Sequence, residues 1–129
     1  MTDEDRAGGG QPECPEPHTL LVAVDESDNS RRAVDYVARW VACYEAARVV
    51  LAHVVKEPSR DVLPDDDERE RYLSQRRDGA ARLLGRTRET LERAGIPDAR
   101  IDSKTLSCSP PDTVVDALLE ETRRGAYDT

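Results

Sequence analysis

Two short apolar segments constrain the fold of this chain more than any other feature. Residues 19–24 read TLLVAV and residues 48–55 read RVVLAHVV, and both are rich in β-branched side chains. Continuous apolar strands of this kind are typical of a parallel sheet that is buried on both faces. The segment between them is amphipathic, with apolar residues three or four apart: Ala33, Val34, Val37, Ala38 and Val41. The sequence therefore predicts a β-α-β unit, with helix caps available within residues 25–28.

A long helix is predicted over residues 68–94. Gly95 followed by Pro97 is a helix stop signal. Gly79 and Gly85 lie inside the helix, where glycine costs about 1 kcal/mol relative to alanine, so either residue is expected to mark close packing against the sheet. The expected apolar face is Tyr72, Ala80, Leu83, Leu84, Thr87, Leu91 and Ala94.

The last third of the sequence predicts a more polar strand and a final helix. Residues 99–106 alternate in polarity, which favours a strand near an edge of the sheet. The next helix is expected to begin within residues 109–112, with Ser109 or Asp112 as its cap. Its expected buried face is Val114, Val115, Leu118, Leu119 and Thr122.

The predicted order is β-α-β-α-β-α, followed by residues 126–129, which read as the lead-in to a further strand. We therefore expect residues 19–129 to be an incomplete domain that lacks its last strands. Residues 1–18 contain glycine, proline and acids with almost nothing to bury, and are expected to be a disordered acidic tail.

Composition excludes several classes of protein. The net charge of −8 and the pI near 4.8 argue against nucleic-acid binding, although residues 1–18 and 61–70 together carry −9 and the rest of the chain +1. Because the acidity lies in these two segments, it does not exclude an anionic ligand elsewhere. No apolar run approaches the ~18 residues of a transmembrane helix, and the N-terminus does not resemble a signal peptide. Three scattered cysteines predict neither a disulfide framework nor a zinc site, which favours a reducing cytoplasm.

The candidate site lies at the carboxyl ends of the predicted strands, where open parallel sheets bind their ligands. Asp25, Ser27 and Val54 fall at this edge, and the free N–H groups of the first helix favour an anion there. The alternative is that Asp25 and Ser27 only cap the helix. The sequence has no glycine between residues 10 and 79, so it contains neither a dinucleotide-binding fingerprint nor a P-loop at a strand-to-helix junction.

No catalytic or metal-binding residue is predicted. His53 lies inside an apolar strand, where a packed, hydrogen-bonded histidine is commoner than a catalyst. The acidic residues 65–68 lack the glycine and the spacing of a calcium loop, so they are interpreted as a solvated loop. The many arginines of the long helix alternate with acids and are interpreted as a solvated surface.

The segment LLVAVDESDNSRRAVDYVARW, followed by VVLAHVV, resembles the opening of a universal stress protein domain. The shared pattern is an apolar strand ending in Asp25, Ser27 two residues later, an amphipathic helix, and a strand containing His53-Val54. The resemblance covers residues 19–129. It implies an α/β, Rossmann-like fold of the adenine nucleotide α-hydrolase type, with a three-layer parallel sheet that here lacks its last strands.

The resemblance also implies a function. Many members of the family bind ATP, so we expect a stress-response module that binds nucleotide and is non-catalytic or hydrolyses ATP weakly. The adenine and ribose contacts carried over from the family fall on Ala23, Val24, Asp25 and Val54. The family's phosphate-binding glycines follow a fourth strand that this sequence does not include, and Glu26 replaces a residue that is commonly small, so its carboxylate is expected to repel phosphate. The expected partners are an adenine nucleotide and, in the full-length protein, a second copy, with neither nucleic acid nor membrane.

Two alternatives stay open. One is an interaction domain of the same fold that acts through dimerisation without ATP. The other is a receiver-like signalling domain, suggested by the acidic residues after the first strand. A receiver needs an aspartate at the end of its third strand, and here that strand runs into Leu106-Ser107-Cys108.

Overall fold

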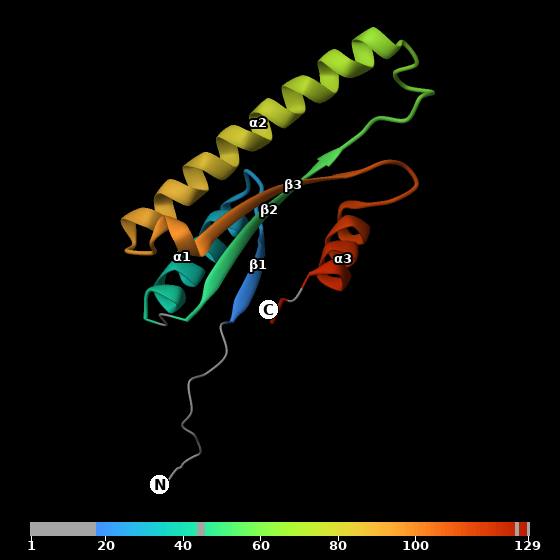
Figure 1. Cartoon of the computed structure of the whole chain (residues 1–129). Helices are drawn as coiled ribbons and strands as arrows, with labels where there is room; N and C mark the ends of the chain where they lie inside the picture. Colours follow the sequence, from blue (N-terminus) through green and yellow to red (C-terminus); the bar gives the residue numbers. More distant parts are fainter. Residues whose placement is uncertain (1–17, 44–45, 126, 129) are drawn as a thin grey trace, which may run out of the picture.

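The two apolar segments form neighbouring parallel strands of an α/β fold. The computed structural model describes residues 18–43, 46–125 and 127–128. The sheet has the strand order β1-β2-β3, so the more polar third strand lies at an edge, as predicted. Helices α1 and α2 lie on one side of the strands and α3 on the other, which gives three layers (Figure 1). The elements are β1 (Thr19–Ala23), α1 (Asp28–Ala42), β2 (Arg48–Lys56), α2 (Asp66–Arg93), a 3-10 turn (Asp98–Arg100), β3 (Ile101–Cys108) and α3 (Val114–Arg124).

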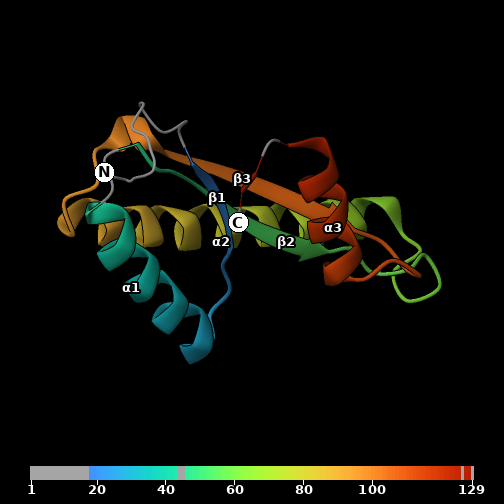
Figure 2. The same cartoon turned by 90° about the horizontal axis from the view of Figure 1, so that it is seen from below.

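The main core lies between the sheet and the first two helices. The register pairs Val22 with Leu51, and alternate residues of each strand face this side. Leu51 and Leu91 are fully buried there. Seen from below, α2 spans nearly the whole width of the molecule, with α1 near one end of it and α3 near the other (Figure 2). The core side chains include Leu20, Val22, Val24, Val34, Ala38, Val41, Val49, Leu51, Leu83, Leu84, Leu91, Ile96 and Ile101.

The ends of the first two helices follow local rules. Ser27 caps α1 and Asp65 caps α2, each by accepting hydrogen bonds from backbone N–H groups of the first turn. The predicted stop at Gly95 is confirmed, since this residue has a φ of +102°. Two expectations of burial were wrong: Ala33 and Ala94 are exposed, because each lies at the margin of its helix's packed face. Leu73, which is not part of the predicted apolar face of α2, is also buried.

The final helix differs from the prediction at its start and on its buried face. Its cap is Thr113, which forms a capping box with Asp116, so Ser109 and Asp112 lie in the preceding turn. Val115 and Leu119 are 62% and 48% exposed, and Thr122 is also exposed. Glu121 is the buried residue of this helix and forms an ion pair with Lys104 of β3, while Val114 and Leu118 are half-buried.

The described residues at the two ends of the chain meet beside β1. The backbone N–H of Asp128 donates to the Thr19 carbonyl over 2.8 Å, and the Thr19 N–H donates to the Asp128 carboxylate over 2.8 Å. The ladder with β2 already engages His18, whose carbonyl accepts a hydrogen bond from the Arg48 N–H. The expected disordered tail is residues 1–18, of which residues 1–17 lie outside the described part of the chain, whereas His18 is placed and joins the ladder with β2.

Candidate functional site

The turn between β1 and α1 is held by three short polar side chains. The Ser27 N–H donates to Oδ1 of Asp25 over 2.8 Å, and the Ser30 N–H donates to Oγ of Ser27 over 3.1 Å. Oγ of Ser30, a buried residue, accepts a hydrogen bond from the Asp25 N–H over 3.0 Å. The hydrogen bonds to Ser27 hold the pKa of the Asp25 carboxyl below its usual value of 3.8, with a weaker contribution from His53. Asp25 therefore presents a carboxylate at neutral pH.

A side chain of β2 fixes the end of β1. Backbone pairing of the two strands extends to Ala23 and Ala52, and the Val24 N–H still donates to the Ala52 carbonyl. The Val24 carbonyl oxygen lies 2.7 Å from Nδ1 of His53. Because a carbonyl only accepts, Nδ1 carries the proton in this hydrogen bond. His53 thus joins the carboxyl ends of the two strands at the place where the sequence analysis located the site.

A cleft of about 570 Å³ opens between the carboxyl end of β2 and the long helix α2. Its walls combine an apolar part with cations and one carboxylate. This size lies in the range of small-molecule binding sites. The lining residues are Glu26, His53, Val54, Val55, Lys56, Tyr72, Gln75, Arg76, Gly79, Ala80, Arg82 and Leu83.

A smaller cleft of about 340 Å³ lies beside it, between α1 and α2, and includes Val24 and Asp25 in its lining. Glu26 lines both clefts. Its carboxylate forms an ion pair with Arg86 of α2 over 3.3 Å. Both side chains are more than half exposed, so the pair adds little to stability, but it places a compensating charge beside Glu26.

Other surfaces carry less of the expected chemistry. An open groove of about 780 Å³ lies at the opposite end of β1, lined by His18, Tyr36, Arg39, Trp40 and Cys43.

Among the described residues, no three His, Cys, Asp or Glu side chains gather in a way that could hold a metal ion. No helix of the described ranges is long and apolar enough to cross a membrane. Strands β2 and β3 end at Lys56 and Cys108, so neither supplies the aspartate of a receiver domain.

The turn at Asp25 and Ser27 after β1, the helix α1 and the position of His53-Val54 on β2 follow the order that the family resemblance implies. A comparison with models of protein families finds that residues 17–122 match the model described as "Universal stress protein family". The chain belongs to this family. A search of curated proteins found none that matches this universal stress protein chain.

Solved structures of other family members share the fold. A universal stress protein family member from Burkholderia pseudomallei is 20% identical, with a TM-score of 0.61, over 84% of this chain and 74% of that one. The universal stress protein UspA from Lactobacillus plantarum is 16% identical, with a TM-score of 0.64, over 84% and 73% of the two chains. A universal stress protein solved in complex with cAMP is 25% identical, with a TM-score of 0.52, over 83% and 69%.

The four predicted contact residues of this universal stress protein do not share one cleft. Val54 is half-buried and lines the larger cleft. Asp25 and the buried Val24 line the smaller one, and Ala23 is exposed at the end of β1. His53 lines the larger cleft and Val24 lines the smaller one, so the hydrogen bond between them connects the two clefts.

The contribution of α2 to the larger cleft is not predicted by the sequence. The arginines of this helix alternate with acids, a pattern interpreted above as a solvated surface, whereas Arg76 and Arg82 line the cleft. A signal was present, because Tyr72, Gly79 and Leu83 recur at helical spacing with a glycine at the centre. The expectation that Gly79 or Gly85 marks close packing was wrong. A Cβ on Gly79 would lie 4.0 Å from Arg82, and one on Gly85 would meet nothing within 4 Å.

Proposed function

We propose that this universal stress protein binds ATP at the carboxyl ends of β1 and β2 and acts in the cytoplasm as a stress-response module. The observation that carries the proposal is the cleft of about 570 Å³ at the end of β2, which Val54 lines. The hydrogen bond from His53 to Val24 brings the β1–α1 turn to the same edge. Open parallel sheets bind ligands at this edge, and the family member at 25% identity was solved in complex with cAMP.

The residues of this edge suggest complementary roles. The apolar Val54 side chain suits an adenine ring, and the charged carboxylate of Asp25 suits hydroxyl or amino donors of a nucleoside. We expect binding without catalysis, or at most weak ATP hydrolysis, because the sequence analysis identified no nucleophile with an adjacent general base.

Titration calorimetry with ATP tests the proposal. We expect saturable binding, weakened by Asp25→Asn, which keeps an oxygen for the Ser27 N–H but removes the charge. Asp61→Asn, in the loop before α2, is the matched control and should leave the affinity unchanged. Absence of binding at millimolar ATP would rule out the nucleotide proposal. Rapid phosphate release at saturating ATP would contradict a non-catalytic role.

The second candidate is an interaction domain of the same fold that acts through a homodimer without ATP. The exposed Val115 and Leu119 side chains of α3 favour it, since they lie one helical turn apart on one face. Light scattering at increasing protein concentration separates the two candidates. A dimer that Leu119→Asp dissociates supports the second, and a monomer at all concentrations excludes it.

A further inference from the structure

The arginines of α2 fall into two groups. Most of them form ion pairs with acidic residues of the same helix or its neighbours: Arg69 with Glu57, Arg77 with Glu70, Arg86 with Glu26, Arg88 with Asp98, and Arg93 with Glu89. Within the described part of the chain, Arg71, Arg76 and Arg82 have no ion-pair partner. Two of these three line the larger cleft.

Lys56 adds a third cation to the same cleft. It is the last residue of β2 and, among the described residues, it also has no ion-pair partner. Among the residues that the structure describes, Glu26 is the only acid in the lining, and its charge is offset by Arg86. The cleft therefore carries an excess of positive charge in a molecule whose overall net charge is −8. Such a concentration of unneutralised cations in one concave site favours an anion.

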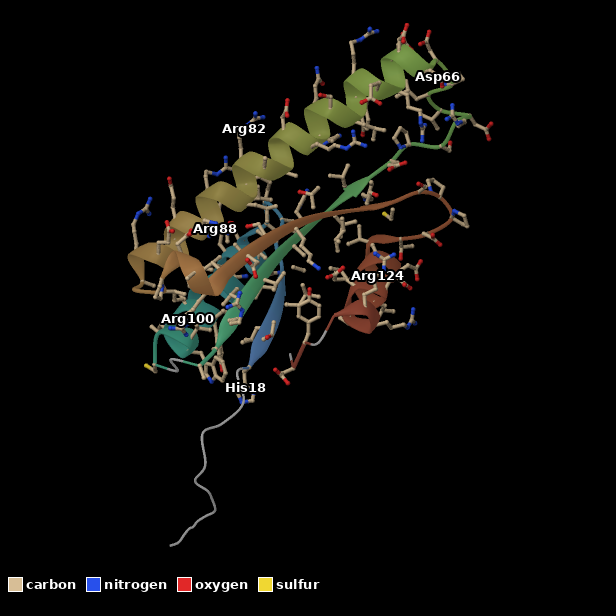
Figure 3. The ribbon with its side chains drawn as sticks, viewed as in Figure 1. His18, Asp66, Arg82, Arg88, Arg100 and Arg124 are labelled. Atoms are coloured by element: carbon tan, nitrogen blue, oxygen red, sulfur yellow. The ribbon has the colours of Figure 1, made fainter. Side chains whose placement is uncertain are left out.

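The geometry of the two arginines supports this interpretation. The Arg76 guanidinium lies over the Tyr72 ring, 5.0 Å from its centroid, which restrains the side chain at the cleft wall. Arg82 lies on the outer side of α2 (Figure 3) and also lines the cleft. A terminal nitrogen of its guanidinium would lie 4.0 Å from a Cβ placed on Gly79, so the side chain extends toward the cleft-lining Gly79. Guanidinium groups recognise phosphate oxygens through paired N–H donors.

We propose that Lys56, Arg76 and Arg82 bind the phosphate groups of the nucleotide, with Val54 in the same cleft contacting its base. This inference rests on the proposed function and deepens it, because it assigns phosphate recognition to α2 and the end of β2. The three cations of this cleft outnumber its single carboxylate, so they offset the repulsion between Glu26 and phosphate that the sequence analysis expects.

The test compares ATP with adenosine in titration calorimetry at low ionic strength. The wild type should bind ATP at least a hundredfold more tightly than adenosine, since each of the two arginines is expected to contribute about tenfold. Arg76→Ala combined with Arg82→Ala should abolish most of this difference, roughly tenfold for each arginine removed, and leave adenosine affinity unchanged. Arg71→Ala combined with Arg77→Ala removes the same charge from the same helix outside the cleft, and should change ATP affinity less than twofold.

Equal ATP affinity in the wild type and the Arg76/Arg82 variant would overturn the inference, as would an equal loss in both double variants. Equal affinity of the wild type for ATP and adenosine would overturn it while the proposed base site remains. If neither ligand binds, the proposed function fails, and inorganic tripolyphosphate then decides the inference alone. Tripolyphosphate that binds the wild type and the Arg71/Arg77 variant, but not the Arg76/Arg82 variant, supports the anion site. Any other pattern refutes it.

Discussion

Nδ1 of His53 donates a hydrogen bond to the carbonyl oxygen of Val24 across the end of the β1–β2 ladder, over 2.7 Å. This hydrogen bond links β1 and β2 one residue beyond their last backbone pair, which is Ala23 with Ala52. It lies between the two clefts at the carboxyl edge. The position of the β1–α1 turn relative to Val54 therefore depends on one side chain of β2.

Replacement of His53 by alanine should lower the free energy of unfolding by about 1–2 kcal/mol, because the Val24 carbonyl loses its partner in a half-buried place. Urea denaturation followed by circular dichroism measures the change. Gln75→Ala is the control, since this exposed side chain of α2 lies outside the core, and it should shift stability by less than about 0.5 kcal/mol. An equal effect of the two substitutions would contradict a structural role for the His53 contact.

Asp25 should make stability depend on acid pH. Its carboxyl has a pKa below 3.8 in the folded protein, so the folded state binds fewer protons than the unfolded state. The stability that it contributes is present above the unfolded pKa and is lost as pH falls through the folded pKa. Urea midpoints at pH 7, 4 and 3 should therefore fall more steeply for the wild type than for Asp25→Asn. Parallel pH curves for the two proteins would exclude this linkage.

Glu121 holds α3 against the sheet. Its side chain is 4% exposed, and its Oε2 accepts hydrogen bonds from Nζ of Lys104 and from the Tyr127 hydroxyl, each over 2.6 Å. Glu121→Gln should cost about 1–2 kcal/mol, less than the ~3–5 kcal/mol of a fully buried pair, because Lys104 is half exposed. Glu120→Gln removes an exposed carboxylate one residue away and should change the denaturation midpoint little.

The same cluster predicts an alkaline limit to stability. Burial raises the pKa of the Tyr127 phenol above 10.0, and the hydrogen bond to Glu121 raises the pKa of Lys104 above 10.5. A group whose pKa is raised on folding stabilises the protein below its unfolded pKa, and this contribution disappears as pH rises through the folded value. The difference in stability between wild type and Glu121→Gln should therefore shrink above pH ~10. A stability difference between the two proteins that stays constant from pH 7 to 11 would contradict this alkaline limit.

Two glycines of the α2 region should respond to alanine in opposite directions. Gly95 has a φ of +102°, where a Cβ is strained, so Gly95→Ala should destabilise the protein by about 1–2 kcal/mol. Gly85 lies in the middle of α2 on its exposed side, where an added Cβ would meet nothing within 4 Å. Gly85→Ala should therefore stabilise the protein by about 0.5–1 kcal/mol. Thermal unfolding of both variants gives the signs directly.

Local sequence patterns were sufficient to predict the elements and their order. The apolar runs around Val22 and Leu51 predicted parallel strands, and the two runs pair with each other as β1 and β2. Ser27 and Gly95 predicted helix ends, since caps depend on a few neighbouring backbone groups. The residues of the strand ends, including Asp25 and Val54, were placed at the carboxyl edge on the same basis.

Only the tertiary structure decided which side of each helix is buried and which charges remain without partners. The apolar stripe of α3 predicted burial of Val115 and Leu119, but these two side chains are exposed, and the covered side of the helix carries Glu121 with the half-buried Val114 and Leu118. The arginines of α2 look alike in the sequence, and their difference depends on which acids lie within reach after folding. Glu26, 60 residues away from Arg86, neutralises that arginine, and no acid does so for Arg82 among the described residues. Helix periodicity is a property of neighbours in the chain, whereas charge compensation in a cleft is set by contacts between distant segments.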